Sequence, residues 1–181
     1  MKRVLKVLVC MLALLSVNCW FGLALAQDED KPLLQMELVH SHSQYPAGAS
    51  YPLALQVTIA PGYHINSDKP NSPELIPTTL SLKGVAGISL GKIMTPAPQQ
   101  HMVKGEDEPW LVWDNKVTFI ADLQVDKDVV PGSYEMVFNL MYQACDDNMC
   151  QMPTTEQLMF LIEVVAAGQP LIPINDDVFT Q

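Results

Sequence analysis

The feature that most constrains the fold is an alternation of apolar and polar residues in short runs along most of the chain. From Leu53 to Ile59, for example, every second residue is a leucine, valine or isoleucine. Alternation with a period of two is typical of a β-strand that is buried on one side only. Runs of this kind predict strands at residues 34–40, 53–59, 79–82, 88–94, 117–125, 134–142 and 157–165.

The breaks between these runs are rich in residues that favour turns. Proline and glycine restrict or relax the backbone, and asparagine and aspartate hydrogen-bond to nearby backbone groups. Such residues cluster at 45–48, 61–62, 69–73, 114–115 and 131–132. Seven short strands at this spacing predict an all-β fold, namely an immunoglobulin-like antiparallel β-sandwich, and about 130 residues suffice to bury its two-sheet core.

The first 26 residues have the composition of a targeting segment. Three basic residues precede an apolar run from Val7 to Ala26, which ends in Ala24-Leu25-Ala26 and is followed by acidic residues. A basic start, an apolar middle and a small-x-small motif at the end are typical of a secretory signal peptide. We therefore expect a signal peptide at residues 1–26, cleaved near Ala26, and a protein exported to a Gram-negative-type periplasm.

Two alternatives apply to the same segment. An uncleaved membrane anchor is one, because the apolar run has about the length of a membrane-spanning helix. Asn18 and the cleavage site favour the signal peptide. Lipidation at Cys19 is the other alternative, but the three residues before it lack the expected small side chain next to the cysteine.

Removal of residues 1–26 changes the charge and the cysteine count. The remaining chain keeps all twenty acidic residues and seven of the ten basic ones, a formal charge of −13. With no basic patch left, nucleic acids and anionic membrane surfaces are poor partners. Cys145 and Cys150 are the two cysteines that remain. We expect one domain at residues 27–165 and a polar, loosely ordered tail at 166–181.

Cys145 and Cys150 lie between the predicted strands 134–142 and 157–165. If these strands pair as a hairpin, the two cysteines can face each other at disulfide distance. A bridge over so short a loop adds only about 2 kcal/mol of stability, whereas a small ring at an accessible loop tip suits thiol–disulfide exchange. Asp146 and Asp147 disfavour a thiolate, so neither cysteine is expected to be a strong nucleophile without a docked partner.

Two other functions fit the same segment. Soft-metal (copper) binding is one, because Cys145, Met149, Cys150 and Met152 offer the soft donors that Cu(I) prefers, and His101-Met102 could add to them. A binding or assembly domain with a purely structural disulfide is the other. His40-Ser41-His42 is more typical of a solvated strand end than of a ligand set. Sequence motifs for nucleophilic hydrolysis or phosphate binding are lacking, so no cofactor is expected.

Two segments resemble a known family. "YQACDDNMCQMP", which follows the strand segment "PGSYEMVFNL", resembles part of the N-terminal periplasmic domain of the thiol:disulfide interchange protein DsbD. The matching residues are Tyr142, Gln143, Cys145, Cys150 and Pro153. "PGYHINSDKP", at residues 61–70, is similar to an early segment of the same domain. The resemblance covers residues 33–165, nearly the whole chain after the predicted signal peptide.

The resemblance implies a sandwich whose cysteine pair cycles between dithiol and disulfide. Cys145 and Cys150 would carry out the exchange, with Cys150 favoured as the site of the mixed disulfide. In this family a thioredoxin-like domain, fed by a membrane thiol transporter, supplies electrons, and disulfide proteins of the periplasm receive them. Because neither part occurs in this sequence, the expected donor is a separate thioredoxin-like protein or transporter. The implied activity is that of a protein-disulfide reductase-type relay.

The resemblance also suggests supporting residues. Trp110, in "GEDEPWLVWDN", is a candidate shield over the cysteines, and packing at a strand edge is the alternative for Trp110 and Trp113. Tyr142 and Gln143 are expected to orient the cysteine loop through packing and hydrogen bonds, or else simply to end the strand. His64 is expected to cap an edge of the core rather than to lie at the site.

Overall fold

The structure is a computed structural model that describes residues 32–179. The signal peptide predicted at residues 1–26 lies outside the described residues. Within residues 32–179 no helix is long and apolar enough to cross a membrane.

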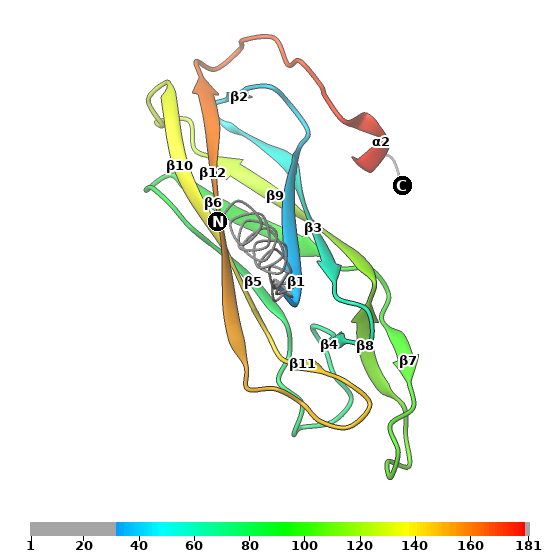
Figure 1. Ribbon diagram of the computed structural model, residues 1–181. Helices are drawn as coiled ribbons and strands as arrows, with labels where there is room; N and C mark the ends of the chain where they lie inside the picture. Colours follow the sequence, from blue (N-terminus) through cyan, green and yellow to red (C-terminus); the bar gives the residue numbers. More distant parts are fainter. Residues whose placement is uncertain (1–31, 180–181) are drawn as a thin grey trace, which may run out of the picture. The chain divides into compact units, whose positions relative to one another are not determined.

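The described chain consists of β-strands and one short helix (Figure 1). The elements are β1 (Leu34–His40), β2 (Tyr45–Pro46), β3 (Ala49–Ile59), β4 (His64–Asn66), β5 (Thr79–Lys83), β6 (Ile88–Met94), β7 (Gln99–His101), β8 (Trp110–Asp114), β9 (Lys116–Val125), β10 (Gly132–Tyr142), β11 (Ala144–Cys145), β12 (Thr154–Val165) and α2 (Asp176–Phe179). They form three sheets, with strand orders β1-β3-β9-β6, β2-β12-β10-β5 and β11-β4-β8-β7.

The first two sheets make up the predicted sandwich, and the fold is an immunoglobulin-like β-sandwich. Every strand predicted from alternation is present, and β1 and β6 have the predicted bounds. Pairing is antiparallel except for the short β2, which runs parallel to β12. The sequence patterns missed β2, β4, β7, β8 and β11. Four of these strands have two or three residues, too few to show a period of two, and β8 has five residues but begins with four apolar ones in a row, so it does not alternate.

The core lies between the two sheets of the sandwich. The alternating residues of β3 point into it, since Leu53, Leu55, Val57 and Ile59 are all buried. On the opposite sheet, Phe138 of β10 stacks on the ring of Phe160 of β12, with the ring centroids 4.9 Å apart. Side chains from both sheets belong to one hydrophobic cluster, which is the arrangement that the alternation predicts.

The third sheet, β11-β4-β8-β7, is called the small sheet here. It lies toward the lower end of the domain in Figure 1. Its strands continue those of the sandwich: β4 follows β3 after a turn at Pro61-Gly62, β8 leads into β9 through Asn115, and β11 follows β10 after Gln143. Asn115 has a φ of 55°, a left-handed conformation that asparagine tolerates better than most residues. The small sheet is therefore joined to the sandwich by three short connections, and its Ile65, Trp113 and Ala144 belong to the same hydrophobic cluster.

The C-terminal segment runs beside the end of β1. The backbone N–H of Ile174 donates to the carbonyl of Ser41 at 2.8 Å, and the Asn175 side chain donates to the carbonyl of His40 at 3.0 Å. Ser41 is buried, and His40 and His42 are half-buried. The expectation of a solvated strand end at residues 40–42 was therefore wrong, because the segment after β12 covers it. The domain boundaries at residues 27–165 and 166–181 stay a prediction.

Candidate redox site

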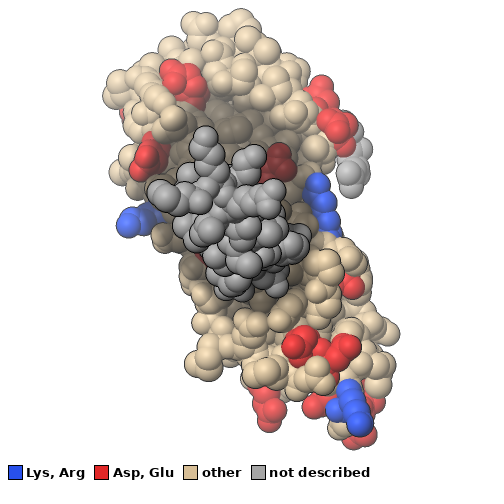
Figure 2. Space-filling model, in the orientation of Figure 1, with Lys and Arg blue, Asp and Glu red and all other residues tan. Residues whose placement is uncertain are grey.

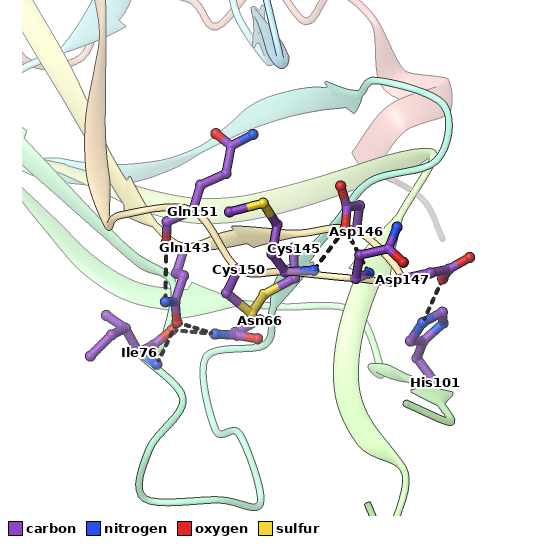
Figure 3. Close-up of a disulfide and its surroundings, with 11 residues drawn as sticks. Asn66, Ile76, His101, Gln143, Cys145, Asp146, Asp147, Cys150 and Gln151 are labelled. Atoms are coloured by element: carbon purple, nitrogen blue, oxygen red, sulfur yellow. Dashed lines mark hydrogen bonds and ion pairs between the residues drawn. A yellow bond between two sulfur atoms is a disulfide. The ribbon is translucent and has the colours of Figure 1, made fainter. Parts of the chain in front are cut away.

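The connection between β10 and β12 forms a tight turn closed by a disulfide (Figure 3). The side-chain oxygen Oδ1 of Asp146 accepts hydrogen bonds from the backbone N–H groups of Asn148 and Met149, at 2.7 and 2.8 Å. These bonds hold the pKa of the Asp146 carboxyl below its usual value. They also bring Cys150 back beside Cys145, and the two sulfurs form a bond.

The two cysteines differ in burial. Cys145 is 0 % exposed because it lies on β11, which pairs with β4, whereas Cys150 is half-buried. The expectation of a freely accessible ring at a hairpin tip was therefore wrong for Cys145. The exposed residues of the turn are Asp147, Asn148 and Met149. A reagent from solvent consequently reaches the bridge on the side of Cys150.

Gln143 links three segments around the disulfide. Its oxygen Oε1 accepts hydrogen bonds from Asn66 Nδ2 at 3.1 Å and from the backbone N–H of Ile76 at 3.3 Å. Its nitrogen Nε2 donates to the carbonyl of Gln151 at 3.2 Å. Tyr142, just before it, is buried in the hydrophobic core. These contacts agree with the predicted orienting role of both residues, which stays a prediction.

His64 lies next to the disulfide. It is the direct cross-strand partner of Cys145, and it is only 3 % exposed. Its nitrogen Nε2 has no hydrogen-bond partner among the described residues. Burial is the main cause that lowers the pKa of its imidazole, and the nearby His101 adds to this effect. The expectation that His64 caps a core edge away from the site was therefore wrong.

His101 connects His64 to the cysteine turn. The ring centroids of His101 and His64 are 4.4 Å apart, and His101 Nε2 lies 3.5 Å from Oδ1 of Asp147. Both histidines and Asp147 line a surface cavity of about 140 Å³, together with Asp114 and Tyr63. Acidic side chains also gather at the end of the face in Figure 2 where the small sheet lies in Figure 1.

The two tryptophans of β8 have different surroundings. Trp113 is buried against Phe119, with ring centroids 5.2 Å apart, and its indole N–H donates to the carbonyl of Pro96. Trp113 thus packs in the core, but on an inner strand rather than at the strand edge that the alternative assumed. Trp110 is half-buried, and its ring centroid lies 6.4 Å from that of His64. The shielding role of Trp110 stays a prediction.

The soft donors proposed for copper do not gather into a common site in this state. Both cysteines are used in the disulfide, and Met149 and Met152 are largely exposed. Within residues 32–179 no three His, Cys, Asp or Glu side chains converge as a metal-binding group. Copper binding thus gains no support from the described residues.

The sequence comparison decides the family. Residues 31–162 match the family described as "Thiol:disulfide interchange protein DsbD, N-terminal". The chain belongs to this family. The resemblance stated from the two motifs is thereby confirmed, and a thiol–disulfide exchange domain is supported. No protein in a curated sequence collection matches the chain.

One of the similar solved structures supports the fold. The N-terminal periplasmic domain of ScsB from Proteus mirabilis is 18 % identical, with a TM-score of 0.51, over 72 % of this chain and 47 % of that one. The N-terminal domain of DsbD from Neisseria meningitidis, in the reduced form, is 12 % identical, with a TM-score of 0.40, over 76 % and 88 %. The chain thus spans about half the length of the ScsB structure that it matches.

Sequence reasoning missed several residues of the site. Asn66 and Ile76, which hydrogen-bond to Gln143, were not identified, and His101 was considered only as a donor to a soft metal and not as the partner of Asp147. They come from separate segments that the small sheet and its loops bring together. The one available signal was the His-x-Asn spacing in "PGYHIN", which places His64 and Asn66 on the same face of any strand.

Proposed function

We propose that this domain exchanges disulfides with partner proteins through Cys145 and Cys150. The observation that supports this most directly is the disulfide between the two cysteines of the segment that matches the DsbD family. After the predicted signal peptide these are the only two cysteines of the sequence. In this proposal the domain is a relay in the periplasm and needs no cofactor.

The burial of the two sulfurs orders the steps. An incoming thiolate attacks Sγ of Cys150, the more exposed cysteine, and forms a mixed disulfide with it. The Cys145–Cys150 bond breaks, and its electron pair leaves on Cys145 as a thiolate. A second thiolate of the partner then attacks the partner's own sulfur in the mixed disulfide. It releases Cys150 as a thiolate, so that the domain is reduced by two electrons and the partner is oxidised.

The proposed donor is a thioredoxin-like protein or a membrane thiol transporter, and the proposed acceptors are disulfide proteins of the periplasm. Family membership supports this, because the family is that of a thiol:disulfide interchange protein. The predicted signal peptide supports export, and the structural relative from Proteus mirabilis is itself a periplasmic domain. Reduction of an acceptor runs the steps above in reverse, with the Cys150 thiolate attacking the acceptor's disulfide.

Trapping of mixed disulfides in cells tests the proposal. Cys145→Ala leaves Cys150 without its resolving partner, so it should accumulate covalent complexes that a reducing agent dissolves. Cys150→Ala should trap far less, because Cys145 is buried. The double Cys→Ala variant controls for non-covalent association. If Cys145→Ala traps no protein, the relay function is wrong.

The structural-bridge alternative makes a different prediction. If the disulfide only stabilises the fold, its reduction potential should lie far below about −300 mV, out of reach of cellular thiols. If it is a redox pair, the potential should lie above this value. Reduction should then lower the free energy of unfolding by only about 2 kcal/mol, because the closed loop is short. Equilibration with glutathione and urea unfolding of both redox states measure the two quantities.

A further inference from the structure

The register of the small sheet places an ionisable side chain directly opposite a sulfur. Cys145 on β11 is paired with His64 on β4, and His64 is paired with Asp114 on β8. Directly opposed residues of antiparallel strands point to the same face, with Cβ atoms about 4.5–5.5 Å apart. A row of thiol, imidazole and carboxylate groups therefore crosses the sheet. Its members come from three segments far apart in the sequence.

One ring nitrogen of the imidazole in this row lacks a hydrogen-bond partner among the described residues. His64 is buried, and Nε2 makes no hydrogen bond with any described residue. A buried polar atom without a partner costs free energy, and such atoms are uncommon enough that each one needs an explanation. An apolar residue would fill the same space on β4 without this cost. The position of the ring beside Cys145 suggests that the partner arises during the reaction.

The surroundings of His64 set its charge. Burial and the neighbouring His101 lower the pKa of His64, while the carboxylates of Asp147, Asp114 and Asp146 act to raise it. The lowering effects are larger, so the ring is neutral at neutral pH while the disulfide is closed. A neutral imidazole can accept a proton. A new negative charge within a few ångströms would raise its pKa and favour that proton.

Opening of the disulfide creates such a charge. When a thiolate bonds to Sγ of Cys150, the electron pair of the broken bond leaves on Sγ of Cys145, which is buried. We propose that His64 then takes up one proton from solvent and, as an imidazolium, pairs with the Cys145 thiolate. On closure the Cys145 thiolate attacks Cys150, the partner's thiolate leaves, and His64 releases the proton.

A route for the proton is visible at the surface. Asp147 is exposed and faces His101, whose ring meets that of His64. The cavity that these three residues line is about 140 Å³, large enough for water. Protons can therefore reach the ring without passing the sulfurs. In Figure 3, His101 of β7 points toward Asp147 of the cysteine turn.

Imidazole pKa values in the two redox states test this inference. The chain has four histidines, so NMR titration of their ring resonances is tractable once His→Gln variants assign them. In wild-type protein the pKa of His64 should rise by about one unit or more on reduction. The ring of His42, which contacts Tyr51, provides an internal reference for changes unrelated to the site. An equal or lower His64 pKa after reduction would overturn the proposal.

The reduction potential supplies a second readout. In wild type, a plot of the reduction potential against pH should change slope at the His64 pKa of the oxidised protein and again at that of the reduced protein. Both changes of slope should disappear in His64→Gln and remain in His42→Gln. The same pH profile in His64→Gln and wild type would contradict the proposal. If His64→Gln fails to fold, Asp147→Asn at the exposed turn replaces it. Loss of that carboxylate should lower the His64 pKa in both redox states, and an unchanged pKa would count against the proposal.

The inference rests on the proposed function only in requiring that the pair opens and closes. Both measurements use a small dithiol as reductant and no partner protein, so they can succeed even if the trapping experiment finds no partner. Conversely, if partners are trapped but the His64 pKa is the same in both redox states, the relay function is supported and the proposed role of His64 is wrong.

Discussion

The sandwich and the small sheet are built by different means. The sandwich uses strands of up to twelve residues with apolar side chains at every second position, and its core is nearly free of polar groups. The small sheet uses strands of two to five residues, and it buries His64 and Asn66 beside Cys145. The first region gains its stability from apolar burial. The second contributes Ile65, Trp113 and Ala144 to the same core, but it also depends on hydrogen bonds around its buried polar side chains.

This difference implies that the sandwich mainly determines the stability of the domain, whereas the small sheet mainly determines the behaviour of the disulfide. Apolar contacts are non-directional, so the sandwich tolerates change at the surface as long as its core stays filled. Hydrogen bonds fix atoms in direction as well as in distance. The bonds of Gln143 therefore hold the disulfide loop against β4 and the loop at Ile76. We expect substitutions in the sandwich to change the free energy of unfolding, and substitutions in the small sheet to change mainly the behaviour of the disulfide.

The largest effect is expected from Phe138→Ala in the sandwich. Phe138 is fully buried and stacks on Phe160, so its truncation leaves a cavity between the sheets. The free energy of unfolding should fall by about 3–5 kcal/mol in urea titrations. The reduction potential of the variant that remains folded should match that of wild type. A large change in potential would show that the two regions are not separable in this way.

The sandwich was predictable because its signal is local and repeated. Each long strand contains several alternating positions, as in Leu53 to Ile59, and the turn residues mark where it ends. The hairpin around the cysteines followed from the same strands, and β10 does pair with β12 from Tyr142↔Thr154 onward. Sequence reasoning failed where pairing is non-local. The sequence of residues 144–145 does not indicate that they pair with residues 64–65.

The site illustrates the same limit. Cys145 and Cys150 were identifiable as the last two cysteines, but their unequal burial depends on β4, which the sequence did not predict. His64 was misplaced for that reason. The neighbours of His64 depend on the register in which β4 pairs with β11. For strands this short, the register is set by the tertiary arrangement and not by the local sequence.

A smaller effect, confined to the small sheet, is expected from Gln143→Ala. The substitution removes the acceptor of Asn66 Nδ2 and of the Ile76 N–H, and the donor to the Gln151 carbonyl. Stability should fall by about 1 kcal/mol, because each lost bond is partly replaced by water. Reduction of the disulfide by a small thiol should become faster, because the loop is less restrained. Thiol kinetics and urea unfolding measure the two effects.

Gln157→Ala is the matched control for this comparison. Gln157 also makes a side-chain hydrogen bond, from Nε2 to Asn139 Oδ1 at 2.7 Å, but on the exposed face of the sandwich. Its loss should change stability by less than about 0.5 kcal/mol and leave the reduction rate unchanged. Equal effects of the two glutamines on the reduction rate would mean that the contacts of Gln143 do not restrain the cysteine loop.

The smallest effect is expected from pH, and it involves one histidine in each region. Burial lowers the pKa of His40 in β1 and is the main cause that lowers that of His64 in β4. The unfolded chain, whose histidines have the ordinary pKa of about 6.5, therefore binds protons more readily than the folded chain. Stability should be highest above this value and should decline as the pH falls through it toward the lower folded-state values. Urea unfolding of the oxidised protein between about pH 7.5 and pH 5 measures this decline.

Variants assign the decline to the two regions. His40→Gln and His64→Gln should each flatten the pH dependence in part, because each removes one group that must stay neutral in the folded state. The double variant should flatten it further by the sum of the two effects, since the two residues lie in different sheets. If His40→Gln alone removes the whole dependence, His64 is protonated as easily in the folded chain as in the unfolded one, and the small sheet does not desolvate its imidazole.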